Sequence, residues 1–332
     1  MGATIHDVAA RAGVSVATAS RSLSGKRGVR PENHERVLAA ARELNYEPNA
    51  VAAALRSRTT HTIGMVVPRI SNPFFATMVE AIEQQLQEGQ RSLLLGTSHY
   101  DPDVELRQIQ ALLDRRVDAL ITIPCHRERS ASATQLASTR VPTVQLDLRL
   151  EGNVSGWVGV DNDAGIVQVI EHVLAGGARS LAFVGASPSD SSSQERLDSY
   201  RRAATRLDGP HGPVLLGDFT IEWGQEAATR LLDGDDLPDA IVCGNDTIAL
   251  GVLRALTRRG VRVPDDVQVT GFDDIAYAEL AEPPLTTIRQ PQRHMAAEVV
   301  RMLTDQLSGA TESTRRVAVV PELIVRASTA SE

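Results

Sequence analysis

Over most of the chain, short apolar runs of β-type residues alternate with amphipathic helical segments, and this alternation constrains the fold more than any other feature. Ile63–Val67 is followed by the helical pattern of Ala76–Glu88, and Ala240–Cys243 by that of Ala249–Arg259. Parallel strands need long crossover connections, which helices provide, so the pattern predicts parallel sheets covered by helices. Its length of roughly 270 residues predicts two sheets, with a boundary near Gly159–Asn162.

Residues 4–45 lack this alternation and instead predict three short helices. Thr4 begins a Ser/Thr-x-x-acid pattern that caps a helix, and Gly13 suits the positive φ of a tight turn after it. Ser15 is placed to cap a second helix, and Pro31 to occupy the first position of a third. The segment is therefore predicted to be a small helical domain that precedes the α/β body.

Charge is unevenly distributed along the chain. The 332 residues have a formal charge of −8, yet the first 60 hold nine Arg and Lys against five Asp and Glu, a local charge of +4. The remaining residues therefore carry −12. A basic head on an acidic body is typical of a protein in which one small domain meets the phosphates of nucleic acid. The apolar share of 42% is ordinary for a globular protein with a sizeable core.

Several classes of protein are disfavoured by the sequence. No stretch of about 18 residues is free of charge, so no membrane span is expected. Asp7 and Arg11 argue against a signal peptide, which predicts a cytoplasmic protein. Cys125 and Cys243 stand singly in apolar runs and predict buried reduced thiols, with no disulfide and no metal site. Because phosphate-loop, nucleophile-elbow and zinc-protease motifs are missing, we expect neither an enzyme nor a cofactor.

The N-terminal segment resembles the DNA-binding headpiece of the LacI/GalR family of regulators. The resemblance rests on Thr4-Ile5-His6-Asp7-Val8-Ala9, Ala12-Gly13-Val14-Ser15, Thr18, Ser20-Arg21, Arg36-Val37 and Leu44-Asn45-Tyr46-Glu47-Pro48-Asn49. In the body it continues through Ile63-Gly64, Asn72-Pro73-Phe74-Phe75, Asp118-Ala119-Leu120-Ile121, Val141-Pro142, Val160-Asp161-Asn162, Gly244-Asn245-Asp246, Gly271-Phe272-Asp273-Asp274 and Leu285-Thr286-Thr287-Ile288. It implies an all-α helix-turn-helix headpiece followed by an α/β body. The body would consist of two Rossmann-like parallel-sheet subdomains of the type I periplasmic-binding-protein fold, with a ligand in the cleft between them.

The resemblance also implies how the chain is divided. The expected parts are a DNA-binding domain at 1–47, a hinge helix and linker at 48–60, and an effector-binding and dimerisation domain at 61–332. Three strands would cross between the two subdomains of that last part, near 159–162, 288–291 and 318–322. The N-subdomain is then expected at about 61–160 and 291–319, and the C-subdomain at about 161–290 and 320–332.

The residues expected to read DNA follow from the resemblance and from the chemistry of the grooves. A major groove admits one helix, and the second helix of such a motif presents its N-terminal side chains to base edges. Arg21 can form two hydrogen bonds to one guanine, whereas Val16 and Ala17 can read only shape and thymine methyl groups. Ser15 and Thr18 can bind phosphates. The predicted DNA-binding residues are Thr4, His6, Ser15, Val16, Ala17, Thr18, Ser20, Arg21, Arg30, Asn49, Ala52 and Leu55.

The hinge adds a second kind of DNA contact to this expectation. By resemblance, the segment from Asn49 through Arg56 folds only when two copies meet over the operator centre. Leu55 would then wedge into the central base step and open the minor groove, with Asn49 and Ala52 packed alongside. The alternative is that Leu55 is one more leucine of a hydrophobic core. The chain departs from the family at Arg30-Pro31, where a Ser or Thr cap is common, and Arg30 could itself supply the local phosphate contact.

Polar and aromatic residues follow the predicted strands of the body, at the edge where open α/β sheets bind ligands. The resemblance implies an effector cleft lined by Asn72, Phe74, Phe75, Asp147, Asp161, Arg196, Phe219, Asn245, Asp273 and Gln290. Phenylalanine rings suit the flat face of a sugar or a base, and carboxylates with an arginine suit paired hydroxyls. Asp161 is equally consistent with a strand-end residue. A helix cap after a strand is the alternative for one of Asp273 and Asp274. The Ser-rich stretch 189–193 is predicted to be a mobile loop.

We therefore expect a homodimeric transcriptional regulator, a repressor that binds a pseudo-palindromic operator under the control of a small-molecule effector. The effector is expected to be a carbohydrate or a derivative of one that acts as an inducer. A purine- or other metabolite-responsive regulator of the same architecture is the first alternative. A secreted solute-binding protein is a weaker one, because it would lack the headpiece. Without a C-terminal heptad repeat no tetramer is expected, and no membrane partner either.

Overall fold

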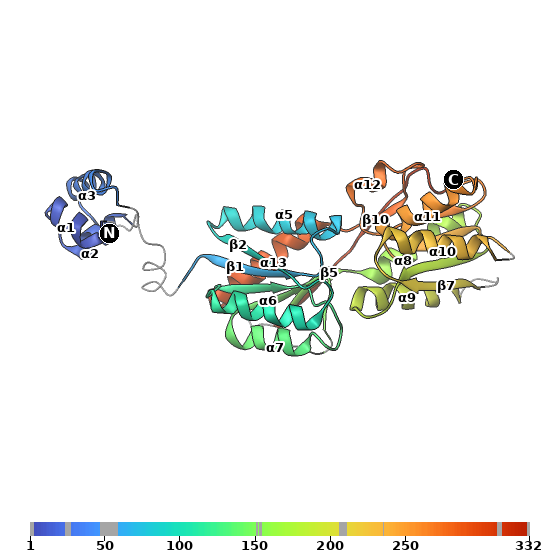
Figure 1. The fold of residues 1–332 in the computed structure, drawn as a ribbon, viewed down its shortest axis with the longest axis horizontal. Helices are drawn as coiled ribbons and strands as arrows, with labels where there is room; N and C mark the ends of the chain where they lie inside the picture. Colours follow the sequence, from blue (N-terminus) through green and yellow to red (C-terminus); the bar gives the residue numbers. More distant parts are fainter. Residues whose placement is uncertain are drawn as a thin grey trace. The chain divides into compact units, whose positions relative to one another are not determined.

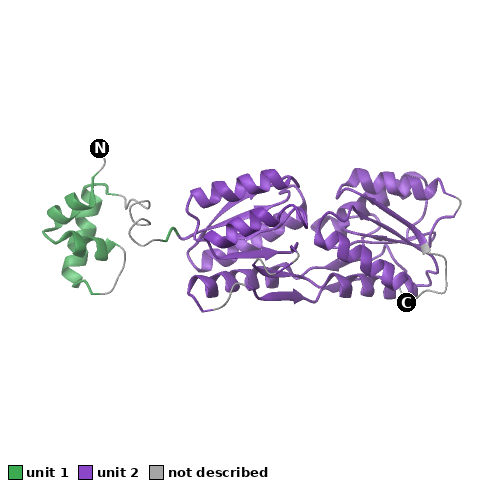
Figure 2. Cartoon of the chain, turned by 90° about the horizontal axis from the view of Figure 1, so that it is seen from below, with its two compact units in different colours: residues 1–60 green, residues 61–332 purple. Residues whose placement is uncertain are grey.

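The chain divides into two compact units, residues 1–60 and residues 61–332, which are coloured separately in Figure 2. A computed structural model describes residues 3–23, 28–46, 59–150, 152, 155–205, 211–234, 236–310 and 314–330. The first unit is helical, and the second alternates strands with helices. The predicted fold class, an all-α headpiece followed by parallel α/β sheets, is thereby confirmed.

The first unit contains three short helices, and local capping explains where they begin and end. They are α1 (Ile5–Ala12), α2 (Val16–Leu23) and α3 (Pro31–Glu43). Thr4 and Asp7 form a reciprocal capping box on α1, and Gly13 ends that helix at φ 63°, the left-handed conformation that glycine adopts without strain. The hydroxyl of Ser15 accepts the Thr18 N–H at 3.2 Å at the start of α2. A small core holds the helices together, built from Val8, Ala9, Ala12, Ala19, Val37, Ala40 and Ala41.

The second unit begins with elements that build one sheet and its covering helices. These are β1 (Thr62–Val67), α5 (Pro73–Glu88), β2 (Ser92–Thr97), α6 (Pro102–Asp114), β3 (Ala119–Thr122), α7 (Ala131–Arg140), β4 (Thr143–Leu146) and β5 (Gly156–Val160). The next elements build a second sheet: α8 (Asn162–Ala175), β6 (Leu181–Ala186), α9 (Ser191–Ala204), β7 (His211–Gly217), α10 (Ile221–Leu232), β8 (Ala240–Cys243), α11 (Asp246–Arg258) and β9 (Gln268–Thr270). The last are α12 (Ala276–Glu279), β10 (Thr287–Arg289), α13 (Gln292–Leu307), β11 (Arg316–Val319) and β12 (Glu322–Ile324).

The order of the strands shows how the chain passes between the two sheets. The first sheet, which we call the N-subdomain sheet, has the order β11-β5-β4-β3-β1-β2 with all pairs parallel. The second, the C-subdomain sheet, has the order β7-β6-β8-β9, also parallel. Since β11 joins the N-subdomain sheet while β10 pairs antiparallel with β12 near α8, the late segments return from one subdomain to the other. Figure 1 shows these connections in orange and red.

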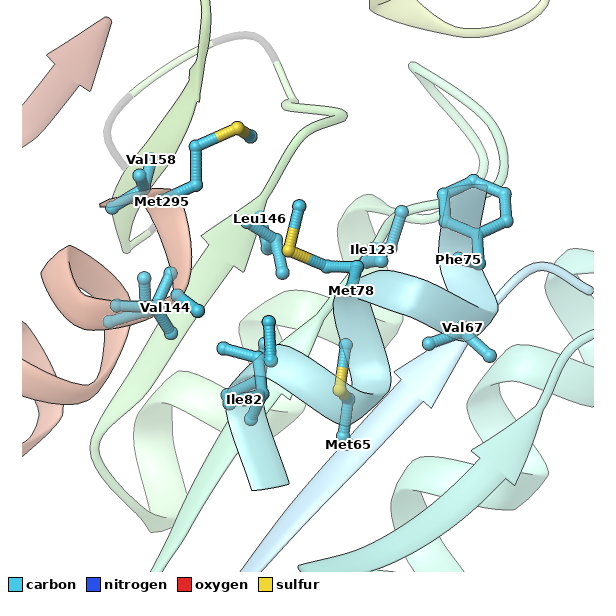
Figure 3. Packing of buried hydrophobic residues seen from close by; sticks show 14 of the residues in the cluster. Met65, Val67, Phe75, Met78, Ile82, Ile123, Val144, Leu146, Val158 and Met295 are labelled. Atoms are coloured by element: carbon cyan, nitrogen blue, oxygen red, sulfur yellow. The ribbon is translucent and has the colours of Figure 1, made fainter. Parts of the chain in front are cut away.

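Each sheet is covered by helices on both faces, and the alternation of side chains along the strands assigns the faces. In the N-subdomain, Met65 and Val67 of β1 pack with α5, α13 and neighbouring strands in the cluster drawn in Figure 3. Val66, one residue along, points to the opposite face and packs with α6 and α7. In the C-subdomain, Phe183 packs with α8 and α9 while Val184 packs with α10 and α11. Burial of each such side chain contributes about 1.5–3 kcal/mol.

The stretch 189–193 differs from its sequence-based prediction. It was expected to be a mobile loop, but it forms the N-terminus of α9, and Asp190, Ser192 and Ser193 are buried. Asp190 caps the helix by accepting the Ser193 N–H and hydroxyl, both at 2.8 Å. A run of serines favours loops because serine competes for backbone hydrogen bonds. Here that same competition is used for capping, which the composition of the run alone does not reveal.

Candidate functional sites: the cleft and the headpiece

The candidate cleft lies where strands of both sheets end. Chain segments that follow β1, β2, β4, β6, β7, β8 and β9 contribute to one small compartment. Its lining residues are Asn72, Phe74, Phe75, Tyr100, Asp147, Leu148, Ser192, Arg196, Phe219, Asn245 and Asp273. We call it the inner compartment. Its volume of about 30 Å³ suits roughly two water molecules.

Arg196 is the buried cation of the inner compartment. Its side chain is only 5% exposed. Its Nε donates to Asn162 Oδ1 and its Nη1 to the Gly244 carbonyl, each at 2.8 Å. The guanidinium also lies 3.7 Å from the centre of the Phe272 ring, a cation–π contact. These contacts hold the side chain in a single orientation, so that it acts as a fixed charge in the wall of the compartment.

Two buried aspartates face the same compartment. Burial raises the pKa of Asp147 to about 7, although the charge of Arg196 opposes this. Burial likewise raises the pKa of Asp273 to about 6, opposed by Arg196, whose Nη1 lies 3.7 Å from Asp273 Oδ1, and by the hydrogen bond from Gln290. Among the described residues, Asp147 Oδ1 has no hydrogen-bond partner. A buried carboxylate oxygen without a partner is costly, and it marks a position where a ligand hydroxyl can bind.

Two asparagines that line the compartment also cap helices. Asn72 caps α5 by accepting the Phe74 N–H at 3.1 Å, and Asn245 caps α11 by accepting the Ile248 N–H at 2.9 Å. The N-termini of α5 and α11 are therefore directed to the compartment by residues that also line it. The two caps fix the positions of the amide groups that a ligand would meet.

An aromatic pair separates the inner compartment from a larger one. Tyr100, after β2, and Phe219, after β7, stack with ring centres 6.5 Å apart and planes 20° apart, and both line the two compartments. The outer compartment has a volume of about 280 Å³, and polar groups such as Arg69, His126 and Asp218 line it. Because Tyr100 comes from the N-subdomain and Phe219 from the C-subdomain, their contact spans the cleft.

Further contacts across the cleft gather at the N-terminus of α9. The Arg127 N–H donates to the Ser189 carbonyl at 2.9 Å, and the Arg149 N–H donates to the Ser191 hydroxyl at the same distance. The Arg149 guanidinium pairs with Glu195 at 2.7 Å. Loops after β3 and β4 of the N-subdomain are thereby bound to one helix end of the C-subdomain. Any widening of the cleft must change these contacts.

The headpiece presents one side of α2 to solvent. Ala17 and Arg21, one turn apart on that helix, are both exposed. Val16 is half-buried and packs against the small core of the headpiece. Thr18 is also half-buried, and its hydroxyl lies 2.9 Å from that of Ser15. The exposed face of the helix thus offers Arg21 as its hydrogen-bonding group for base edges.

Comparison with known proteins assigns both units. Residues 4–49 match the model for bacterial regulatory proteins of the lacI family, and residues 170–329 match that for a periplasmic binding protein-like domain. The repressor PurR of Haemophilus influenzae is 33% identical over 335 residues, 99% of each chain. The chain belongs to the LacI family. It is therefore a DNA-binding transcriptional regulator and not an enzyme.

Two solved structures resemble this LacI-family regulator over nearly its whole length. A Lac repressor dimer bound to operator and the anti-inducer ONPF has a TM-score of 0.91 at 28% identity, with 100% of each chain covered. A complex of the transcriptional regulator CelR with cellobiose has a TM-score of 0.74 at 32% identity, with 98% of this chain and 99% of that chain covered. Among the described residues, no helix combines the length and the apolar character needed to cross a membrane.

Most effector residues predicted for the regulator lie in the inner compartment, and two do not. Asp161 caps α8 by accepting the Ala164 N–H at 3.0 Å and lines a different groove, so its strand-end interpretation describes it better. Gln290 lines another groove, together with Asp273, and its amide donates to Asp273 Oδ1 at 2.8 Å. Gln290 would therefore affect a ligand only by positioning the Asp273 carboxylate.

The helix-cap alternative for Asp273 and Asp274 does not describe either residue. Among the described residues, no side chain caps α12, and the Ile275 N–H before it donates to Asp246 at 2.8 Å. Asp273 bonds Gln290, while Asp274 pairs with Arg289 and Arg326. Asp246 is wholly buried, and burial raises its pKa well above the usual value. The Asp273 side chain is therefore part of the cleft wall, and the Asp274 side chain is part of an ion-pair cluster.

Sequence reasoning missed three residues of the inner compartment, namely Tyr100, Leu148 and Ser192. Tyr100 follows β2, just as the predicted residues follow their own strands, so its position was a usable signal. Ser192 lies in the stretch assigned to a loop. In the headpiece, Thr4, His6 and Arg30 are exposed, and Arg30 precedes α3 without a side-chain cap. The hinge predictions for Asn49, Ala52 and Leu55 lie outside the described residues.

Proposed function

We propose that the protein is a homodimeric repressor that leaves a pseudo-palindromic operator when a carbohydrate binds in its cleft. The observation that carries the effector assignment is the inner compartment itself. Fixed carboxylates, an arginine and aromatic rings converge there from two subdomains. The CelR–cellobiose complex, a relative at 32% identity, supports a carbohydrate by analogy.

The DNA-reading part of the proposal rests on the exposed side of α2. Arg21 and Ala17 are suited to base edges, because a guanidinium can bond guanine through two donors and a small side chain permits close approach. Ser15, Thr18, Ser20 and Arg30 would contact phosphates, with Thr4 and His6 at the start of α1. Val16 would contribute only the part of its side chain that the headpiece core leaves exposed. The proposed hinge contacts of Asn49, Ala52 and Leu55 complete the set.

Exposed apolar side chains support the homodimer. β2 is the last strand of the N-subdomain sheet, and its Leu94 and Leu95 are 36% and 41% exposed. In the C-subdomain, Tyr277 is 56% exposed and Leu280 is 78% exposed. Exposed apolar side chains on an edge strand are a liability that a partner subunit removes. The similar Lac repressor structure contains a dimer.

The geometry of the cleft suggests how an effector would act. At about 30 Å³, the inner compartment is smaller than a sugar ring, so a sugar can enter only if the cleft widens. Widening would break the Tyr100–Phe219 stack and the contacts at the start of α9. A ligand can shift this equilibrium only by its different affinity for the two arrangements. We infer that the arrangement favoured by the sugar holds the two headpieces less well on DNA.

The test begins with selecting duplexes from a random library with the purified protein. Fluorescence anisotropy on the selected duplex then measures operator affinity while sugars, sugar phosphates and purines are titrated. The proposal predicts that one sugar weakens operator binding and that Arg21→Ala removes sequence preference. A purine that acts instead would identify the first alternative, a purine-responsive regulator. A protein that selects no sequence at all would contradict the DNA-reading proposal.

A further inference from the structure

We propose that the cleft selects an uncharged carbohydrate and rejects phosphorylated or otherwise anionic sugars. This inference rests on the proposed carbohydrate effector and narrows it to one charge class. It comes from the balance of buried charges around the inner compartment, which is a property of this chain's own residues.

Acidic groups outnumber basic ones at the inner compartment. Asp147 and Asp273 line it and are 5% and 6% exposed, and Asp190, at 3% exposed, stands beside them at the start of α9. Arg196 is the cation in the lining set. With all three carboxyls ionised, the compartment carries a net charge of −2. Only protonation of all three would make it positive.

Part of the arginine's charge and hydrogen-bonding capacity is already used within the protein. Its Nε and Nη1 already donate to Asn162 and Gly244, and its charge is shared with Asp273 at 3.7 Å. A phosphate that entered would meet carboxylates across a low-dielectric space in which like charges repel strongly. Anion sites in proteins usually combine backbone N–H groups with several cations. The N-termini of α5 and α11 supply N–H groups here, but the lining set pairs a single arginine with two carboxyl groups.

The same groups suit a neutral, hydroxyl-rich ring. Asp147 Oδ1 and the Ser192 hydroxyl are buried without a hydrogen-bond partner among the described residues. A sugar hydroxyl can donate to the carboxylate and accept from the serine, while a fully ionised phosphate group in the same position can only accept, and so can pair with the serine alone. Tyr100 and Phe219 stack on each other in this structure, and they can offer their flat faces to the C–H side of the ring once the cleft widens.

The outer compartment does not reverse this balance. Arg69 and His126 line it, but Asp190 and Asp218 line it as well. Arg69 lies over the Tyr100 ring, 5.3 Å from its centre. A charged group at the outer end of a ligand would therefore meet one guanidinium, a histidine and two carboxyl groups.

Calorimetric titration of the full chain with matched pairs tests the inference. The pairs are glucose and glucose 6-phosphate, ribose and ribose 5-phosphate, and trehalose and trehalose 6-phosphate, with galactose and cellobiose as further neutral probes. The expected result is binding by a neutral sugar, with its phosphate at least about 100-fold weaker, as like-charge contact predicts. A phosphate that binds as tightly as its neutral partner overturns this inference and leaves the carbohydrate effector standing. If no sugar of either kind binds, the carbohydrate proposal fails and this inference with it.

Asp147→Asn and Asp273→Asn test whether the carboxylates cause the selection. Each of these variants should bind the neutral sugar more weakly, while its affinity for the sugar phosphate should not fall. The ratio of the affinity for the neutral sugar to that for its phosphate should therefore decrease by about tenfold. Glu171→Gln, on the exposed side of α8, changes the net charge equally and should leave the ratio unaltered. A ratio that stays the same in both aspartate variants would contradict the inference. The wild-type comparison stands even if one variant fails to fold.

Discussion

Replacing Asp147 by asparagine should make the protein more stable and less responsive to its effector. Asn has nearly the same shape as Asp and tolerates the left-handed backbone at residue 147, where φ is 59°. The substitution therefore removes a buried charge without creating a cavity or new strain. The two effects have opposite signs, which separates this substitution from ordinary damage to a fold.

The size of the stability effect follows from the pKa of Asp147, which burial raises from 3.8 to about 7. A shift of one unit corresponds to about 1.4 kcal/mol, so keeping this carboxyl buried at pH 7 costs up to about 4 kcal/mol. Arg196 already reduces this cost. The native protein binds more protons at this site than the unfolded chain between pH 3.8 and about 7, so its stability falls as pH rises across that range.

Thermal unfolding of wild type and Asp147→Asn at pH 5, 6 and 7 measures this directly. The variant should unfold at a higher temperature, by on the order of 10 °C at pH 7, and the difference should shrink at pH 5. Calorimetric titration should show sugar binding weakened by about 1–3 kcal/mol, since a carboxylate acceptor is lost. Glu171→Gln should change neither quantity.

A variant that is less stable than wild type at pH 7 would refute the reasoning, because the carboxylate would then be stabilised by contacts stronger than its burial cost. An increase in stability without any loss of sugar affinity would refute the other half, the role of Asp147 as a ligand acceptor. The Asp147 carboxyl is also affected by the charges of Arg196, Asp273, Asp190 and Glu195. The pH dependence of stability is therefore a property of this set of interacting residues and not of Asp147 alone.

Three further predictions concern other parts of the molecule. Arg21→Ala should abolish preference for the selected operator at a cost of about 1–3 kcal/mol while leaving sugar affinity intact; an anisotropy titration that shows unchanged preference would remove Arg21 from the readout. Gly13→Ala should destabilise the headpiece by about 1 kcal/mol or more, because φ is 63° and the added Cβ would lie 2.5 Å from the Arg36 guanidinium; equal melting of variant and wild type would argue against this. Leu95→Glu should weaken dimerisation by at least about tenfold by placing a charge on the proposed interface; a dimer of undiminished stability in analytical ultracentrifugation would locate the interface elsewhere.

The fold could be predicted well from the sequence where local sequence signals agree with the packing of the folded protein. The Thr4 capping pattern and the Gly13 turn are read from a few neighbouring residues, and the structure contains both. The alternation of apolar runs and helices predicted two parallel sheets, because such runs can be buried only between helices. The resemblance to the family pointed to residues such as Asn72 and Asn245, which follow strands at the edge where α/β sheets bind ligands.

Local signals were insufficient where packing between distant segments decides the outcome. The stretch 189–193 reads as a loop, but it begins α9, where Asp190 caps the helix and the Ser191 hydroxyl accepts the Arg149 N–H of the other subdomain. Tyr100 reaches the compartment by stacking on Phe219, which lies more than a hundred residues away in the other subdomain. Asp161 follows a strand like the others, yet its carboxylate is used to cap α8. Such pairings depend on how the subdomains meet, which sequence periodicity does not specify.

The central claim is that a sugar in the cleft controls the affinity of the headpiece for DNA. The most direct test is a fluorescence anisotropy titration of the selected operator duplex with the full chain, with and without the neutral sugar identified by calorimetry. The account predicts that the sugar weakens operator binding and that Asp147→Asn reduces this response while preserving operator affinity without sugar. Operator affinity that is the same at every concentration of a sugar known to bind would contradict it.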